Sequence, residues 1–196
     1  PFLLLDDFGS LNPDDYIAGF PWHPHRGIET VTYIINGEVD HQDSLGNKGV
    51  IKGGDVQWMT AGSGIIHQEM PQRFDGESKG FQLWVNLPRA YKMSDPEYRG
   101  IVKKDIPIVG TDACSVNIIT GAYGDKVGPV KDIAIKTFYL DVILHPGKTF
   151  IFDAPAHFTI FLYIFEGSVR IAGSDAVGKS FVVLTRDGET IEVSAE

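Results

Sequence analysis

Cysteine is nearly absent from this chain, because Cys114 is the single cysteine among 196 residues. One cysteine cannot form an internal disulfide, and such sparing use is typical of proteins from a reducing compartment. Residues 1–7 also lack the basic region and the small-residue cleavage site of a secretory signal. We therefore expect a cytoplasmic protein, or a nuclear one if the source is eukaryotic.

Basic residues are few and do not cluster. The 26 Asp and Glu residues outnumber the 17 Lys and Arg residues, which gives a formal net charge of -9. Phosphate contacts need a basic patch, so direct binding to nucleic acid or to an anionic membrane is disfavoured, and a role in transcription would need a protein partner. No apolar run reaches the roughly 18 residues that a membrane-spanning helix requires.

Two short stretches each carry a pair of potential metal ligands two residues apart. The first pair is His23 and His25, and the second is His67 and Glu69. Residues two apart in a strand point to the same face, so two strands could aim four ligands at one point. Three imidazoles and one carboxylate suit Fe, Mn, Co, Ni or Zn, whereas a set without cysteine sulfur argues against an iron–sulfur cluster or a structural zinc finger.

Turns and alternating segments around these pairs predict antiparallel β structure. Asn36-Gly37 is the strongest short hairpin signal, and the strand after it is expected to pair with the strand before it. Residues 88–100 contain two prolines and no sustained helical stripe, so we expect a connector there with at most one short helical turn. The expected strands of this half include residues 29–35, 38–43, 48–52, 56–60 and 81–87. The pattern predicts an all-β, barrel-like fold.

The second half of the chain repeats the first. The run Tyr-Ile-Phe-Glu-Gly-Ser-Val at 163–169 aligns with Tyr-Ile-Ile-Asn-Gly-Glu-Val at 33–39, which sets Asp153 and Pro155 opposite the first two histidines. Such a repeat predicts two stacked barrels, one with a metal site and one without. The second barrel lacks a closing strand and is expected to be incomplete. The predicted domains are residues 1–100 and residues 101–196.

The glycine and histidine spacing resembles that of the cupin superfamily. Its first motif is matched by Gly19, His23, His25, Glu29 and Gly37, and its second, more loosely, by Gly54, Thr60, Gly62 and His67. His-Pro-His-Arg-Gly and Glu-Met-Pro together look like one branch of that superfamily, the pirins. The resemblance is strongest over residues 20–87.

The pirin resemblance implies two tandem cupin barrels of the double-stranded β-helix or jelly-roll type. Pirins usually continue with further strands, so we expect that the C-terminal barrel here is either cut short or incomplete. It implies that His23, His25, His67 and Glu69 hold one divalent transition metal, with Fe(II) favoured over Mn, Co, Ni, Cu or Zn. Glu29 is then a supporting residue. The implied activity is that of a quercetin 2,3-dioxygenase, in which Glu69 is the general base towards the 3-hydroxyl of a flavonol and O2 is the second substrate.

Apolar side chains near the ligands are candidates for the wall of a pocket for a flat aromatic substrate. They are Phe20, Trp22, Trp58 and Met59. Ordinary barrel core is an equally good interpretation of Trp58 and Met59, because Val-Gln-Trp-Met alternates like a strand. His41 is interpreted as a polar-face residue, and His145 and His157 as surface or packing histidines.

A rival function comes from a different class. Some pirins act as transcription cofactors, so the resemblance also implies a non-enzymatic protein that senses metal or redox state and regulates transcription or metabolic enzymes through protein contacts. A sugar isomerase of the cupin type is a third interpretation, but such enzymes use a histidine base without this four-ligand set. Oxygen uptake on quercetin separates the first two.

Overall fold

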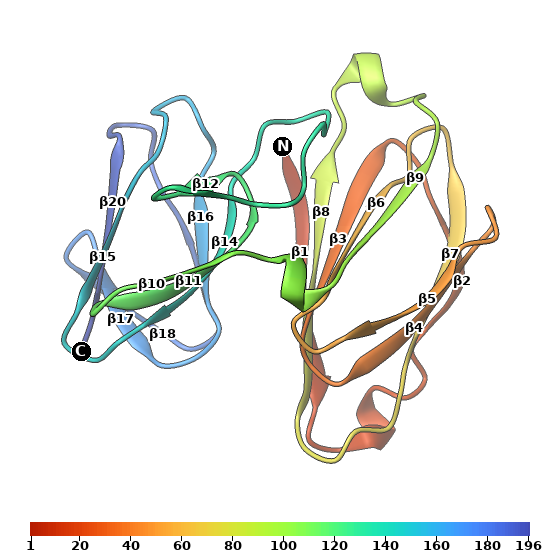
Figure 1. Cartoon of the computed structure of the whole chain (residues 1–196), viewed down its shortest axis with the longest axis horizontal. Helices are drawn as coiled ribbons and strands as arrows, with labels where there is room; N and C mark the ends of the chain where they lie inside the picture. Colours follow the sequence, from red (N-terminus) through yellow and green to blue (C-terminus); the bar gives the residue numbers. More distant parts are fainter. The chain divides into compact units, whose positions relative to one another are not determined.

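The computed structural model describes all 196 residues, and β-strands account for most of its regular structure (Figure 1). The first nine strands are β1 Phe2–Ser10, β2 Phe20–His25, β3 Ile28–Asn36, β4 Glu38–Asp43, β5 Lys48–Lys52, β6 Val56–Thr60, β7 Ile65–Pro71, β8 Ser78–Asn86 and β9 Glu97–Ile101. The 3-10 helices are η1 Pro13–Asp15, η2 Arg89–Tyr91 and η3 Lys103–Asp105. No helix has the length and hydrophobicity needed to cross a membrane. The prediction of an all-β fold is confirmed.

The chain divides into two compact units. The first unit comprises Pro1–Pro107, Ile119–Gly121 and Gly128–Phe138, and the second comprises Ile108–Ile118, Ala122–Val127 and Tyr139–Glu196. The first unit contains two antiparallel sheets, ordered β1-β8-β3-β6-β9 and β2-β7-β4-β5 (Figure 1). Every residue of the predicted ligand pairs lies on the second of these sheets.

The turn at Gly37 carries the chain from one sheet to the other. Strand β3 pairs with β6 and β8, whereas β4 pairs with β5 and β7, so the hairpin predicted at Asn36-Gly37 is wrong. Gly37 has a φ of 97°, a conformation that glycine adopts without steric cost. A tight turn alone does not decide which strand the returning segment pairs with. The packing of the two sheets against each other decides it.

The two sheets of the first unit face each other across a shared interior. Thr32 on β3 donates a hydrogen bond to Glu69 on β7, so the even-numbered side chains of β3 point towards the second sheet. The odd-numbered ones, Glu29 and Val31, lie on the opposite face because strand side chains alternate. This alternation decides which of the predicted site residues can meet.

Residues 88–100 contain the predicted short helical turn, which is η2, and also a strand that was not predicted. That strand is the start of β9, which pairs along β6 and brings Met59 opposite Tyr98. The strand was missed because its sequence, Glu-Tyr-Arg-Gly-Ile, is short and has only two apolar members of clear strand preference.

The second unit has its own core. Its sheets have the orders β10-β11-β14, β15-β20-β17-β18, β16-β19 and β12-β13. The strands are β10 Ile108–Gly110, β11 Cys114–Thr120, β12 Ala122–Tyr123, β13 Lys126–Val127, β14 Tyr139–Leu144, β15 Thr149–Asp153, β16 Phe161–Ile164, β17 Ser168–Ile171, β18 Ser174–Val177, β19 Ser180–Val183 and β20 Thr190–Ala195. Val116, Ile118, Phe150 and Val193 are among the buried residues that fill it.

Candidate metal centre

Strand pairing brings the two predicted ligand pairs together. Strand β2 runs antiparallel to β7, and His23 lies directly opposite His67. Strand β7 pairs on its other side with β4, where Glu69 lies opposite His41. Directly opposite residues share a face, so these four side chains and His25 are directed into the interior between the two sheets.

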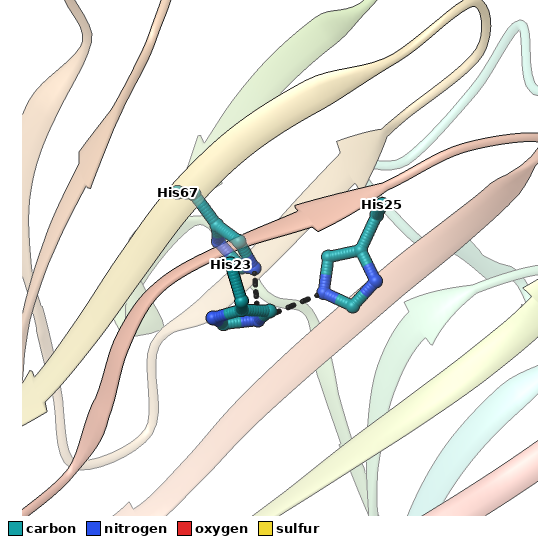
Figure 2. A group of neighbouring side chains, drawn as sticks. All are labelled: His23, His25 and His67. Atoms are coloured by element: carbon teal, nitrogen blue, oxygen red, sulfur yellow. Dashed lines mark hydrogen bonds between the residues drawn. The ribbon is translucent and has the colours of Figure 1, made fainter.

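The three histidines converge through their Nε2 atoms. The Nε2 atom of His23 is 3.0 Å from that of His25 and 2.9 Å from that of His67, as the dashed lines in Figure 2 indicate. His25 and His67 are buried, and His23 is half-buried. The group is therefore accessible at His23 and enclosed at the other two rings.

The nitrogen spacing fits a metal ion. Ligands about 2.1 Å from a metal and about 90° apart are separated by about 3.0 Å, whereas tetrahedral ligands at that bond length are about 3.4 Å apart. The observed separations of 2.9 and 3.0 Å match the first case. Three nitrogens on adjacent corners of an octahedron would leave positions for a carboxylate and for substrate.

A backbone contact prepares His23 for this role. Its Nδ1 atom lies 2.8 Å from the carbonyl oxygen of Pro21. A carbonyl oxygen only accepts, so Nδ1 must carry the proton, and the lone pair of the neutral ring is then on Nε2. Such a partner on the far nitrogen is the usual arrangement for a metal-binding histidine.

Burial keeps the other two rings neutral. Burial, with a smaller contribution from His23, lowers the pKa of His25 to about 4. Burial and the neighbouring histidines lower the pKa of His67 to about 3. A metal needs the unprotonated ring, so both residues are ready to bind at neutral pH.

Glu69 lies beside His67 and is fully enclosed. Its Oε1 atom accepts a hydrogen bond of 2.8 Å from the Thr32 hydroxyl, and its Oε2 atom accepts one of 2.6 Å from the Gln82 amide. Burial raises the pKa of Glu69, and these two hydrogen bonds oppose that rise. Its carboxylate forms a second group with His41 and His67, in which the three ligand atoms lie within 4.8 Å of one another; this group shares His67 with the group of three histidines.

The structure corrects the interpretation of His41 as a polar-face residue. His41 is 1% exposed and stacks on the Tyr98 ring, with ring centroids 4.9 Å apart and an interplanar angle of 27°. Neither ring nitrogen has a hydrogen-bond partner, and Nε2 lies 3.6 Å from Asp43 Oδ2. Strand β4 alternates inward at Val39, His41 and Asp43, so polar residues occupy its interior face.

Glu29, the supporting residue of the cupin motif, is on the face of β3 that points away from the histidines. It is 1% exposed, and its Oε1 atom accepts a hydrogen bond of 2.9 Å from Thr60. Burial raises the pKa of Glu29, while the Thr60 hydroxyl opposes the rise. Its register opposite Thr60 and Val85 keeps its carboxylate out of the histidine group.

The predicted pocket residues separate into two kinds. Phe20 and Trp22 lie on β2 with the histidines and are 37% and 51% exposed. Met59 is buried on the interior face, in a cluster with Ile28 and Ala61, and Trp58 is buried on the opposite face, paired with Val31. Trp58 therefore points away from the histidines and does not line a pocket beside them.

Sequence reasoning missed three interior residues that contact the predicted ligands. Thr32 and Gln82 donate to Glu69, and the Trp84 ring lies edge-on to His25 at 5.0 Å. The alternation of residues 81–87 put Gln82 and Trp84 on one face, and that signal could have identified them. His145 and His157, predicted outside the site, are exposed residues of the second unit.

Acid should destabilise the metal-free protein. The pKa values of His25 and His67 in the folded protein, about 4 and about 3, lie below about 6.5, the value in an unfolded chain, so the unfolded chain binds more protons between about pH 6.5 and pH 3. The stabilisation is complete above about pH 6.5 and is lost as pH falls through this window. Urea unfolding of chelator-treated protein at several pH values measures the slope.

The matched variant for this measurement is His25→Gln. It removes one titrating ring, so its unfolding midpoint should depend less steeply on pH in the same window. Glu69 has a raised pKa and acts in the opposite direction, but it is present in both proteins and cancels in the comparison. Parallel pH profiles for the two proteins would contradict the assignment.

Comparison with known proteins identifies the family. The sequence pattern of the family described as Pirin matches residues 1–85, and that of the Pirin C-terminal cupin domain matches residues 139–196. A Caulobacter vibrioides pirin-like protein is 43% identical over 197 residues, which cover 100% of this chain and 71% of the relative. The chain belongs to the pirin family.

Other relatives agree with this assignment. A Pseudomonas aeruginosa protein, named as a proposed quercetin 2,3-dioxygenase, is 44% identical over 99% of this chain and 70% of its own length. The crystal structure of a quercetin 2,3-dioxygenase from Acinetobacter baumannii superposes with a TM-score of 0.89 at 36% identity, over 100% of this chain and 71% of that one. The predicted fold of two tandem cupin domains is confirmed.

Proposed function

We propose that this pirin binds one divalent transition metal through His23, His25, His67 and Glu69, and uses it to cleave flavonols such as quercetin with O2. The convergence of three Nε2 atoms at 2.9 and 3.0 Å is the observation that carries the proposal. The similarity to the Acinetobacter baumannii protein, which is described as a quercetin 2,3-dioxygenase, supports the choice of reaction. Fe(II) is the metal that we propose, because nitrogen and carboxylate ligands with open positions suit non-haem iron.

The bound ion would supply Lewis acidity towards the substrate oxygens and a redox centre for O2. The chain's own contribution begins with neutral donors, since burial holds the pKa values of His25 and His67 far below neutral pH. Neutral rings keep the site free of fixed positive charge, which would otherwise repel a cation. His23 is half-buried, whereas His25 and His67 are buried, so His23 is the ring of the three that a substrate could most easily contact.

Glu69 would take the proton of the flavonol 3-hydroxyl. Burial raises the pKa of this carboxyl, which makes its carboxylate a stronger base than an exposed one. Thr32 and Gln82 hold the two oxygens, so the carboxylate is oriented before substrate binds. Phe20 and Trp22 would offer exposed aromatic surface on the same strand as His23 for a flat ring system.

Metal-loaded protein should consume O2 and release carbon monoxide while the visible absorbance of quercetin decays. Chelator-stripped protein and free Fe(II) in the same buffer should show only the slow background, because neither holds the ion and the base together. The measurement is absorbance decay with simultaneous oxygen uptake under matched metal concentrations. A metal-loaded sample no faster than free metal would reject the dioxygenase and favour the non-enzymatic sensor.

Three further assignments belong to the same proposal. The first unit alone would hold the metal, because Asp153 and Pro155 stand at the histidine positions of the repeat. A protein partner would mediate any regulatory role, since the net charge of -9 disfavours nucleic acid. The cytoplasmic location stays a prediction.

A further inference from the structure

A chain of hydrogen bonds leads from Trp84 to Glu69. The Trp84 indole Nε1 donates to the Oε1 atom of Gln82 at 2.8 Å, and the Nε2 atom of Gln82 donates to Oε2 of Glu69 at 2.6 Å. The same Gln82 nitrogen lies 3.1 Å from the Thr32 hydroxyl, which donates to Oε1 of Glu69 at 2.8 Å. Four side chains from strands β3, β7 and β8 are thereby joined.

Each of these four side chains has only one orientation in which all its hydrogen-bond donors and acceptors are matched. An indole nitrogen can only donate, so Trp84 must face the carbonyl oxygen of the Gln82 amide. The amide nitrogen is then on the side of Glu69 and Thr32. Thr32 accepts from that nitrogen, so its own hydrogen is directed to the carboxylate. Both oxygens of Glu69 therefore face donors.

We propose that Gln82, oriented by Trp84, is a positioning residue that presents the Glu69 carboxylate to the metal. This rests on the metal site of the proposed function. Each carboxylate oxygen uses one lone pair on a donor and keeps another for an ion. Without the Trp84 contact the Gln82 amide could turn over and place its oxygen against the carboxylate, a repulsive contact that would displace Glu69.

Trp84 also touches the other ligand pair. Its ring lies edge-on to the His25 ring, with centroids 5.0 Å apart and an interplanar angle of 80°. One side chain thus orients Glu69 through its nitrogen and confines His25 through its ring. The two roles can be separated, because phenylalanine keeps an aromatic ring and lacks the N–H.

The test compares Gln82→Met, Trp84→Phe and Trp58→Phe with wild type. Gln82→Met keeps the length of the side chain and loses the amide. Trp58→Phe is the matched control, because Trp58 is also buried but faces away from the histidines, on the face of Glu29 and not of Glu69. Co(II) is the probe ion, and competition with a chelator gives its dissociation constant.

Gln82→Met should weaken Co(II) binding by about 10 to 100-fold, the range found when partners of metal ligands are removed. Trp84→Phe should weaken it in the same direction by a smaller factor, and Trp58→Phe should match wild type. The visible ligand-field spectrum of bound Co(II) should shift in the first two variants only. The Trp58→Phe control separates this change from a general effect of core packing.

Three results would overturn the inference. Wild-type affinity and spectrum in both Gln82→Met and Trp84→Phe would show that the hydrogen-bond chain does not position Glu69. A change in Gln82→Met alone would remove Trp84 from the proposal. Equal weakening in Trp58→Phe would reduce the effect to core packing. Failure of wild type to bind Co(II) is a separate outcome, which rejects the metal site and the proposed function instead.

Discussion

Glu69→Gln is expected to lower the turnover of quercetin by about 10² to 10⁴-fold at saturating metal, the usual cost of losing a general base. Glutamine keeps a neutral oxygen and nearly the same shape, so the site should still assemble. Metal affinity should fall less, by about 10 to 100-fold. The measurement is quercetin decay as a function of metal concentration, which separates the rate at saturation from the affinity.

Glu29→Gln is the matched control for this substitution. Glu29 is also buried and also accepts a hydroxyl hydrogen bond, from Thr60, but it lies on the far face of β3. Its replacement should leave metal affinity as in wild type. Equal turnover in metal-loaded wild type and Glu69→Gln would remove the base assignment, whereas no turnover in any sample would favour the non-enzymatic protein.

The two roles of Glu69 compete with each other. A carboxylate bonded to a dication has a lowered pKa and is a poor base unless that bond is weak. Burial acts in the opposite direction and raises the pKa of Glu69. Thr32 and Gln82 also hold the carboxylate within hydrogen-bond distance independently of any ion. A ligand supported in this way can bind weakly and still stay in place, as a base in this site would require.

Local sequence signals predicted the strands near the site closely. The predicted strands at 38–43, 48–52 and 56–60 coincide with β4, β5 and β6. Glycines end these segments sharply, and alternation within β4 and β7 is strict, so the period-two pattern was easy to recognise. The same pattern justified placing His67 and Glu69 on one face.

Pairing between strands could not be read in the same way. The chain after Gly37 enters the other sheet, which the turn sequence does not reveal. His41 was assigned outward because it is polar, but the register of β4 against β7 sets it opposite Glu69 in the interior. Which face of a strand is interior depends on the opposing sheet, and that is information from distant parts of the chain.

The contacts around Glu69 also depend on how strands far apart in the sequence pair and pack. Thr32, Gln82 and Glu69 come from three strands in two sheets, and nothing in any one segment shows that they meet. A polar residue at an alternating position, such as Gln82, looks solvent-facing until the second sheet covers it. Buried polar side chains of this kind are retained where their hydrogen bonds are satisfied.

The largest expected effect is the loss of metal from His23→Ala/His67→Ala. These residues supply two of the three converging Nε2 atoms, 2.9 Å apart, and alanine offers no donor in their place. Removing two direct ligands should weaken binding by more than the roughly 100-fold reached by indirect partners. Elemental analysis of purified wild type should give one metal per chain, with iron as the expected element.

His145→Ala/His157→Ala is the control for this double variant. Both residues are exposed, belong to the second unit and lie outside the repeat register of the ligands. Because the second unit has Asp153 and Pro155 where the first has its histidines, this control should keep one metal per chain. A stoichiometry near two in wild type, or undiminished binding in His23→Ala/His67→Ala, would refute a single site in the first unit.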